Sequence, residues 1–253
     1  MTAVERRKCI LELLKGKGIV EVSQLTKQFA VSKVTLRSDL DDLAARGLLV
    51  RTHGGAVLPE EQQYVRLISD TINEYPQQKQ HIAEKAATLL PPSASVIIDS
   101  GSTTVHIADY LKEKHPYLVV TNSLIVMEKL QGVQDMDILL AGGMFRREGM
   151  SFMGSYTCSC FDSLHADILF LGASGVSVKD GVTCGNLVEA ETKRAMIKRS
   201  SIVVLMADSS KIGKTSLAHV CDWPAVDYFV TDSIPDEERG ALEEAGVTVL
   251  LAG

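Results

Sequence analysis

Two groups of residues in this chain have the chemistry of anion-binding sites. The first group lies within residues 32–53, and it consists of Ser32, Lys33, Val34, Thr35, Arg37, Ser38, Arg51 and His53. Lysine and arginine neutralise DNA phosphates or donate hydrogen bonds to guanine, hydroxyl groups bond to phosphates, and valine methyl groups contact the thymine methyl. Together these residue types predict a surface that contacts DNA.

The second group extends over residues 99–211. It consists of Asp99, Gly101, Ser102, Thr103, Thr104, Asn122, Gly143, Arg146, Glu189, Lys193, Asp208 and Lys211. Small and hydroxyl-bearing residues at the start of a helix leave backbone N–H groups free to bind a phosphate. Lys193 and Lys211 can bind a phosphate or an anionic sugar, whereas Asp99, Glu189 and Asp208 can accept hydrogen bonds from sugar hydroxyl groups. We therefore predict a site for a ligand that combines a phosphate with a sugar.

Parts of both groups have structural explanations that the sequence leaves open. The 99–104 segment can be an ordinary turn between a strand and a helix, and Glu189 and Lys193, four residues apart, can form a salt bridge on a helix surface. Lys33 and Arg37 can likewise lie on a solvated helix face. We favour DNA contact for these two residues because a tight turn, flanking helices and a basic segment surround them.

Three short helices and a hairpin are expected to position the first group. Apolar spacing predicts helices over residues 4–15, 22–29 and 33–46, with Ser32 as the N-cap of the third helix. The short connection before that helix indicates a helix-turn-helix. Over residues 48–57, two extended segments flank a Gly-Gly turn, which indicates a small hairpin, or wing. These elements together predict a winged helix-turn-helix.

A sheet of buried strands is expected to position the second group. After a helix over residues 77–90, near-continuous apolar runs predict strands over residues 96–99, 118–121, 138–141, 168–172, 202–207, 228–231 and 247–251. Such runs are typical of a mostly parallel sheet with helices on both faces, so the predicted fold class is α/β. Several of these strands end in polar or glycine residues, which predicts one crevice at the carboxyl ends of the strands.

The distribution of charge separates the two halves of the chain. Residues 1–57 carry 10 Lys and Arg against 6 Asp and Glu, whereas the rest of the chain carries 16 against 26. A basic segment joined to an acidic body indicates a polyanionic partner for the first part alone. We predict a DNA-binding domain over residues 1–57, a linker over residues 58–76, and an effector-sensing and oligomerisation domain over residues 77–253.

Composition excludes several other classes of protein. Hydrophobic residues make up 45% of the chain and charged residues 23%, which is ordinary for a folded globular protein. There is no apolar run long enough for a transmembrane helix and no secretory signal, so we expect a cytoplasmic protein with no membrane partner. The five cysteines are expected to be reduced thiols. Cys158 and Cys160 lie near His165, but no second ligand pair follows, so we expect no metal and no cofactor.

Three motifs in the N-terminal segment carry a family resemblance. They are Arg6 with Ile10 and Leu14, the run Ser-Lys-Val-Thr-Leu-Arg-Ser-Asp-Leu over residues 32–40, and the run Arg-Thr-His-Gly-Gly-Ala over residues 51–56. Together these motifs resemble the winged helix-turn-helix of the DeoR family of bacterial transcriptional regulators. Ser38 departs from the family pattern, which usually carries a basic residue or Asn at that position.

The rest of the chain carries matching pieces as well. They include Asp99-Ser-Gly-Ser-Thr103, Thr121-Asn122-Ser123, Gly142-Gly143, Gly172-Ala-Ser-Gly175, Glu189-Ala190 with Lys193, and Asp208-Ser-Ser-Lys211. These pieces resemble the C-terminal sensor domain of the same family, whose fold is shared with ribose-5-phosphate isomerase. The resemblance implies a homo-oligomeric repressor of a sugar-metabolism operon, which a phosphorylated sugar or a related metabolite releases from double-stranded operator DNA.

The alternative is an enzyme similar to a sugar-phosphate isomerase, with a regulatory N-terminal module. Such an enzyme needs carboxylate and lysine groups that move a proton next to a bound carbonyl, and Asp208, Glu189 and Lys211 could supply them. Nothing in the sequence requires turnover, and fold kinship with an isomerase concerns shape alone. We therefore expect a binding protein that is not an enzyme.

Overall fold

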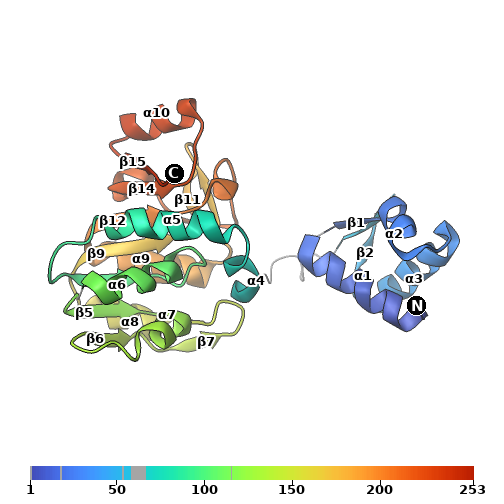
Figure 1. Ribbon diagram of the computed structural model, residues 1–253, viewed down its shortest axis with the longest axis horizontal. Helices are drawn as coiled ribbons and strands as arrows, with labels where there is room; N and C mark the ends of the chain where they lie inside the picture. Colours follow the sequence, from blue (N-terminus) through green and yellow to red (C-terminus); the bar gives the residue numbers. More distant parts are fainter. Residues whose placement is uncertain (1, 18, 53, 58–66, 115) are drawn as a thin grey trace. The chain divides into compact units, whose positions relative to one another are not determined.

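The computed structural model describes residues 2–17, 19–52, 54–57, 67–114 and 116–253 (Figure 1). Their contacts divide the chain into two compact units, Met1–Arg66 and Leu67–Gly253. Among the described residues, no helix combines the length and the apolar character that crossing a bilayer requires.

The N-terminal unit combines three helices with a small antiparallel sheet. Its elements are α1 (Ala3–Lys17), β1 (Ile19–Glu21), α2 (Val22–Phe29), α3 (Lys33–Ala45), β2 (Val50–Arg51) and β3 (Gly55–Val57). Leu36, Leu40 and Leu43 of α3 are fully buried in one cluster with Ile10 and Leu14 of α1. The predicted winged helix-turn-helix is therefore confirmed.

The small sheet contains a strand that the sequence did not predict. Its order is β1-β3-β2, and β1 pairs with β3 so that Glu21 lies opposite Gly55. A Cβ atom on Gly55 would lie 1.8 Å from the carbonyl oxygen of Val20, so this close pairing requires glycine. The wing is thus joined to the helical part through β1.

The N-cap of α3 is Ser32, as predicted. The Ser32 hydroxyl accepts a hydrogen bond from the backbone N–H of Thr35 at 3.1 Å. Ala30, in the turn before it, has a left-handed backbone with φ of 52°. This turn is short enough to bring α2 directly against α3.

The C-terminal unit is built on a seven-stranded sheet in the order β15-β14-β12-β9-β4-β5-β6, and all its strand pairs are parallel. The strands are β4 (Ser95–Ile98), β5 (Leu118–Thr121), β6 (Asp137–Leu140), β9 (Ala166–Gly172), β12 (Ser200–Met206), β14 (Tyr228–Thr231) and β15 (Thr248–Leu251). All seven predicted strands are confirmed, as is the α/β fold class.

Helices cover both faces of this sheet. They are α5 (Pro76–Ala87), the 3-10 turn η1 (Thr104–His106), α6 (Ile107–Lys114), α7 (Leu124–Leu130), α8 (Ser155–Asp162), α9 (Leu187–Lys198) and α10 (Asp236–Glu244). In β4, Val96 and Ile98 pack in one core with α5, α6 and α7, whereas Ile97 packs in the other core with α8, α9 and α10. Burial on both faces explains the uninterrupted apolar runs.

Short elements follow several of these strands and were not predicted. They are β7 (Met144–Arg146), β8 (Ser151–Met153), β10 (Gly175–Ser177), β11 (Gly181–Cys184), η2 (Ser209–Lys211), β13 (Ala218–Cys221) and η3 (Trp223–Ala225). The strands β7 and β8 form a hairpin, and β10, β11 and β13 form a three-stranded antiparallel sheet.

The segment before α5 differs from the linker expected over residues 58–76. Its last part forms helix α4 (Ile68–Ile72), which belongs to the C-terminal unit. Ile68 is buried, and its backbone N–H donates a hydrogen bond to the carbonyl oxygen of Glu148 at 2.7 Å. Residues 58–66 lie outside the described part of the chain.

Candidate functional site

Helix α3 separates its side chains as the predicted DNA-contacting surface requires. Lys33, Val34, Arg37 and Ser38 are exposed, on the side opposite the buried leucines. Val34 is 75% exposed, although exposing an apolar side chain to water is unfavourable. Its methyl groups are therefore free to contact a base edge.

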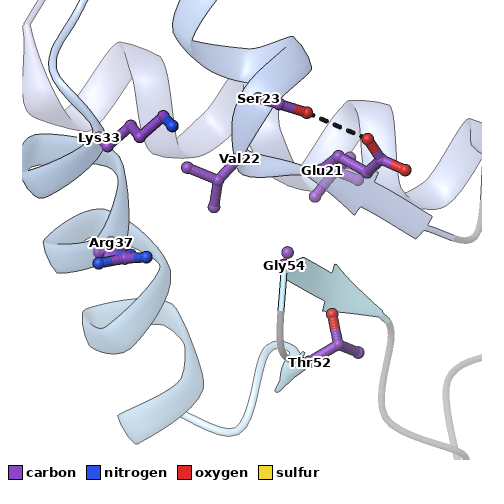
Figure 2. Close-up of a pocket in the computed structure, with 9 residues that line it drawn as sticks. Glu21, Val22, Ser23, Lys33, Arg37, Thr52 and Gly54 are labelled. Atoms are coloured by element: carbon purple, nitrogen blue, oxygen red, sulfur yellow. Dashed lines mark hydrogen bonds between the residues drawn. The ribbon is translucent and has the colours of Figure 1, made fainter.

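A groove of about 510 Å³ lies between α3 and the wing. Figure 2 shows Lys33 and Arg37 on α3, with Thr52 and Gly54 of the wing across the groove and Glu21, Val22 and Ser23 closing one end. Two cations along one wall can neutralise phosphates of a polyanion, while the opposite wall is largely backbone.

Three other residues of the predicted DNA surface have partners within the protein. Arg51 binds Asp41 of α3 through its Nε, at 3.0 Å, and donates from its Nη1 to the carbonyl oxygen of Gly55 at 3.1 Å. Its guanidinium therefore ties the wing to α3 in this structure. The hydroxyl groups of Ser32 and Thr35 are hydrogen-bonded to each other at 2.9 Å. His53 lies outside the described residues.

A buried ion-pair network, not found by the sequence reasoning, fixes α3 against α1. Asp39 accepts hydrogen bonds from Arg6 Nε at 2.6 Å and from Arg7 Nε at 2.8 Å, and Arg7 also binds Asp42 at 2.7 Å. Burial alone would raise the pKa of Asp39, but the hydrogen bonds from the two arginines outweigh it and hold that pKa below its usual value. The sequence signal for this network was Arg6, a charged residue at helical spacing from the apolar Ile10 and so on the same face of the helix.

The second candidate site lies where the chain changes direction across the parallel sheet. From β4 the chain proceeds outward to β5 and β6, and then returns to β9 on the other side of β4. Ligands of open α/β sheets bind at such a switch point, outside the carboxyl ends of the strands. The end of β9 lies very close to the loop after β4. A Cβ atom on Gly172, the last residue of β9, would lie 3.2 Å from the Cα of Gly101 in that loop.

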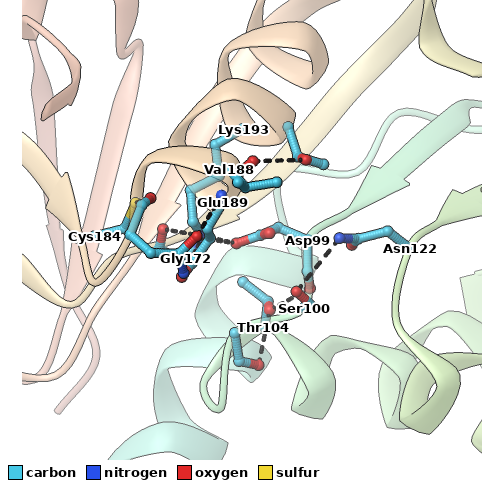
Figure 3. Close-up of polar contacts among 12 residues, drawn as sticks. Asp99, Ser100, Thr104, Asn122, Gly172, Cys184, Val188, Glu189 and Lys193 are labelled. Atoms are coloured by element: carbon cyan, nitrogen blue, oxygen red, sulfur yellow. Dashed lines mark hydrogen bonds and ion pairs between the residues drawn. The ribbon is translucent and has the colours of Figure 1, made fainter. Parts of the chain in front are cut away.

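A buried ion pair occupies the floor of this switch point (Figure 3). Lys193 of α9 binds Asp99 Oδ2 at 2.5 Å, and it also contacts the carbonyl oxygen of Gly172 at 3.0 Å and Glu189 Oε1 at 3.5 Å. Asp99 Oδ2 accepts a further hydrogen bond from the Gly172 N–H at 2.9 Å. Burial alone would lower the pKa of Lys193, but the charges of Asp99 and Glu189 outweigh it and raise that pKa.

This ion pair changes the interpretation of two predicted ligand contacts. Asp99 and Lys193 are 1% and 2% exposed, and the three acceptors around the ammonium use its three donors. The salt bridge between Glu189 and Lys193, left open by the sequence, is present, although Lys193 lies in the interior and not on the surface. In this structure Asp99 and Lys193 fix β4, β9 and α9 relative to one another.

The loop after β4 offers hydrogen-bond donors above this floor. Within the described residues, the backbone N–H groups of Gly101, Ser102 and Thr103 make no hydrogen bond to the protein. The Thr104 hydroxyl donates to the carbonyl oxygens of Asp99 and Gly101, at 2.6 and 2.9 Å, and so holds the loop in this shape. Consecutive free N–H groups form a concavity that suits an anion.

The loops after the neighbouring strands add polar groups on one side. Asn122, directly after β5, donates from its side-chain amide to the carbonyl oxygen of Phe152 at 2.9 Å and to the Ser100 hydroxyl at 3.5 Å. Gly143 follows β6 with a left-handed φ of 154° and is exposed. Arg146, on β7, forms an ion pair with Glu148 at 3.3 Å.

The loop after β12 supplies the last two predicted contacts. Asp208 is 2% exposed, and its Oδ1 accepts a hydrogen bond from the Ser210 N–H at 3.1 Å. Lys211 is half-buried, and in the described part of the protein it forms no ion pair. The structure thus brings the ends of β4, β5, β9 and β12 to one edge of the sheet. Gly172 belongs to this edge but was missing from the predicted site.

Sequence models of two domains match this chain. The DeoR-like helix-turn-helix domain matches residues 6–62, and the DeoR C terminal sensor domain matches residues 74–233. The second match alone covers more than half of the chain, and the two together cover most of it.

Three similar proteins cover nearly the full length. The putative aga operon transcriptional repressor of Escherichia coli O157:H7 is 32% identical over 98% of this chain and 94% of that protein. The HTH-type transcriptional regulator GlpR of Haloferax volcanii is 34% identical over 99% and 98%. The glycerol-3-phosphate regulon repressor of Escherichia coli K12 is 33% identical over 93% of each.

Among solved structures, ribose 5 phosphate isomerase A from Neisseria gonorrhoeae matches 53% of this chain and 52% of that chain, with a TM-score of 0.40 and 20% identity. The two domain matches and the relatives agree with the helix-turn-helix and the sheet-based sensor unit described above. This chain belongs to the DeoR family of DNA-binding transcriptional regulators.

Proposed function

We propose that this protein is a cytoplasmic repressor of a sugar-metabolism operon, and that a phosphorylated sugar or a related metabolite releases it from its operator. The observation that carries the effector assignment is the run of free N–H groups from Gly101 to Thr103, at the switch point of the sensor unit. The names of two relatives, an aga operon repressor and a glycerol-3-phosphate regulon repressor, support the same class of regulation.

On the DNA side, we assign the recognition surface to the N-terminal half of α3. Lys33 and Arg37 contact phosphate or guanine, and the exposed Val34 contacts a thymine methyl. Arg51 stays a predicted contact, which would have to exchange Asp41 for DNA. Operators are read by oligomers whose half-site spacing matches the protein, so the C-terminal unit is assigned to oligomerisation as well as to effector binding.

Binding without turnover fits the chemistry of the crevice better than catalysis does. A lysine that removes a proton must be neutral, whereas Asp99 and Glu189 raise the pKa of Lys193. The buried lysine of the crevice therefore does not suit this role, and the enzyme alternative depends on Lys211 and Asp208. Glu189 is engaged with Lys193 and with the side chain of Asn186, at 3.1 Å. We therefore propose that the crevice holds its ligand and leaves it unchanged.

Coupling between the two units needs only a modest difference in affinity. If the effector binds the DNA-free arrangement about 10- to 100-fold better than the DNA-bound one, it weakens DNA binding by the same factor, about 1.4–2.7 kcal/mol. The difference arises from how the ligand changes the spacing of the two or more DNA-binding units in the oligomer.

The test uses full-length protein and a DNA duplex that the protein itself selects from a random pool. The affinity for this duplex is measured alone and with glycerol 3-phosphate, ribose 5-phosphate or fructose 6-phosphate, each at millimolar concentration. We expect at least one compound to weaken binding tenfold or more. Equal affinity with every compound would refute release by a sugar phosphate, and conversion of a compound, seen by NMR, would refute the assignment as a pure binding protein.

A further inference from the structure

Two buried side chains at the carboxyl edge of the sheet each have one acceptor atom without a donor. Asn122 and Asp208 are both 2% exposed. Among the residues that the structure describes, Asn122 Oδ1 and Asp208 Oδ2 accept no hydrogen bond. Most buried polar atoms in proteins are paired, so a pair of unpaired acceptors at one edge calls for a donor.

Rotation of the side chain does not give either Asn122 Oδ1 or Asp208 Oδ2 a hydrogen-bond donor. The amide nitrogen of Asn122 donates to the carbonyl oxygen of Phe152 and to the Ser100 hydroxyl, so a flipped amide would place oxygen against oxygen. Figure 3 shows the side chain of Asn122, just after β5, reaching toward Ser100. The other carboxylate oxygen of Asp208 caps the turn that follows, by accepting the Ser210 N–H. The two orientations are therefore fixed by bonds that already exist.

The missing partners must be donors, which limits the chemistry of the ligand. Phosphate and carboxylate oxygens are ionised acceptors, and the negative Asp208 would repel them. A hydroxyl group donates one hydrogen bond, and a bond to a charged acceptor is stronger than one between neutral groups. The two acceptors therefore suit hydroxyl groups, while the free N–H groups of Gly101, Ser102 and Thr103 suit the phosphate.

The positions of the two acceptors indicate that they bind different parts of the ligand. Asn122 follows β5 and Asp208 follows β12, and β4 and β9 lie between these strands. Three strand spacings of about 4.8 Å place the two strand ends about 14 Å apart. A single hydroxyl group does not reach both acceptors, so a ligand that satisfies them carries at least two hydroxyl groups that are separated by several carbon atoms.

We infer that Asn122 and Asp208 accept hydrogen bonds from two different hydroxyl groups of the effector. This inference rests on the proposed function, and it narrows the effector to a phosphorylated polyol or sugar longer than glycerol phosphate. It disfavours alkyl phosphates, which lack the hydroxyl groups, and phosphorylated acids, which replace a donor by an acceptor.

The first test needs no ligand. Asp208→Asn removes a carboxylate oxygen that has no donor, so the melting temperature of the free protein should stay the same or rise. Asp232, on the same edge, is the matched control because its two oxygens accept the N–H and the hydroxyl of Ser209, at 2.6 and 2.9 Å. Asp232→Asn should therefore lower the melting temperature. An equal fall in both variants would show that Asp208 is already paired, and would overturn the inference.

The second test compares ligands that share the phosphate. Calorimetric titration of full-length protein would use fructose 6-phosphate, glucose 6-phosphate, ribose 5-phosphate, glycerol 3-phosphate and hexyl phosphate. We expect one of the first three to bind at least about 10-fold tighter than glycerol 3-phosphate and hexyl phosphate. Asn122→Ala and Asp208→Asn should each weaken that ligand about 10-fold, while hexyl phosphate binding changes less than about twofold. The Asp232→Asn control should bind all five as the wild type does.

The outcomes separate the inference from the function on which it rests. If a sugar phosphate binds and releases DNA, but the Asn122 and Asp208 variants bind it as the wild type does, the inference fails and the proposed function stands. The same holds if glycerol 3-phosphate binds as tightly as the longer compounds. If no phosphorylated compound binds or releases DNA, both fail together.

Discussion

The ion pair between Asp99 and Lys193 gives the sharpest test of how the sensor unit is held together. Lys193→Met keeps the length of the side chain but leaves the Asp99 carboxylate buried, with the Gly172 N–H as its remaining hydrogen-bond donor among the described groups. Removing one partner of a buried ion pair typically costs about 3–5 kcal/mol. Both side chains are at most 3% exposed, so solvent does not reduce this value.

Such a loss is large enough for a thermal assay. A unit of this size loses about 2–4 °C of melting temperature for each kcal/mol, so the C-terminal unit of Lys193→Met should melt about 6–20 °C lower. Differential scanning calorimetry of the full chain measures this. Arg239→Met is the matched control, because Arg239 and Glu243 form a half-exposed pair at 2.8 Å in the same unit and should contribute less than about 1 kcal/mol.

A double variant distinguishes the ion pair from simple loss of packing. Asp99→Asn with Lys193→Met leaves no charge at the position of this ion pair, so it should recover at least half of the stability lost in the single variant. The raised pKa of Lys193 also predicts a pH dependence. The charged Lys193 contributes fully to the stability of the C-terminal unit below the ordinary lysine pKa, and this contribution is lost only as the pH rises through the higher pKa of the folded state. The difference from wild type should thus be constant over about pH 6–9. A fall of less than about 2 °C in the single variant would refute this reasoning.

Three further predictions concern DNA binding, the effector and acid stability. Arg37→Ala should weaken operator binding and reduce the salt dependence of log K by about one unit, as measured by fluorescence anisotropy at several salt concentrations; an unchanged slope and affinity would remove Arg37 from the interface. Lys211→Ala, which removes a cation that forms no ion pair among the described residues, should leave DNA binding intact but abolish release by the effector that the wild type recognises, and an equal release would place the anion site elsewhere. Arg6 and Arg7 lower the pKa of Asp39, so ionised Asp39 stabilises the N-terminal unit at pH values above the ordinary carboxylate pKa of about 4. This stabilisation is lost as the pH falls through the lower pKa of the folded state. Acid titration followed by circular dichroism should show this loss in the wild type and not in Asp39→Asn, and parallel titrations of the two proteins would contradict the assignment.

Long periodic patterns in the sequence were sufficient to predict most of the fold. Inner strands such as β4 and β9 are buried on both faces and gave uninterrupted apolar runs, and helix α2 was predicted at the bounds the structure has, Val22–Phe29. Strand β1 has only three residues, too few for alternation to be recognised. Helix α4 has five, and its pairing with Glu148 depends on the distant β7–β8 hairpin, which no local pattern reveals.

The sequence predicted which residues belong to the candidate sites better than it predicted what each residue does there. Exposure of Lys33, Val34 and Arg37 follows from helical periodicity, since the three leucines of the same helix must face the core. Lys193 was expected to face a ligand, but it binds Asp99, which lies 94 residues away in the chain. A contact of that separation depends on the order of strands in the sheet, and the order cannot be derived from spacing alone.

The same strand order has a consequence for how the chain folds. Of the seven strands of this sheet β4 is made first, yet it lies in the interior of the sheet, between β5 and β9. During synthesis it can pair with β5 soon after both emerge, but its other edge has no neighbour until residues 166–172 follow. An apolar strand with one open edge invites association with other chains, and such non-local pairing is slow. A nascent chain ending before β9 would thus expose the edge of β4 that β9 covers in the finished protein. The proposed crevice at the carboxyl ends of β4 and β9 forms only once both halves of the sheet have met.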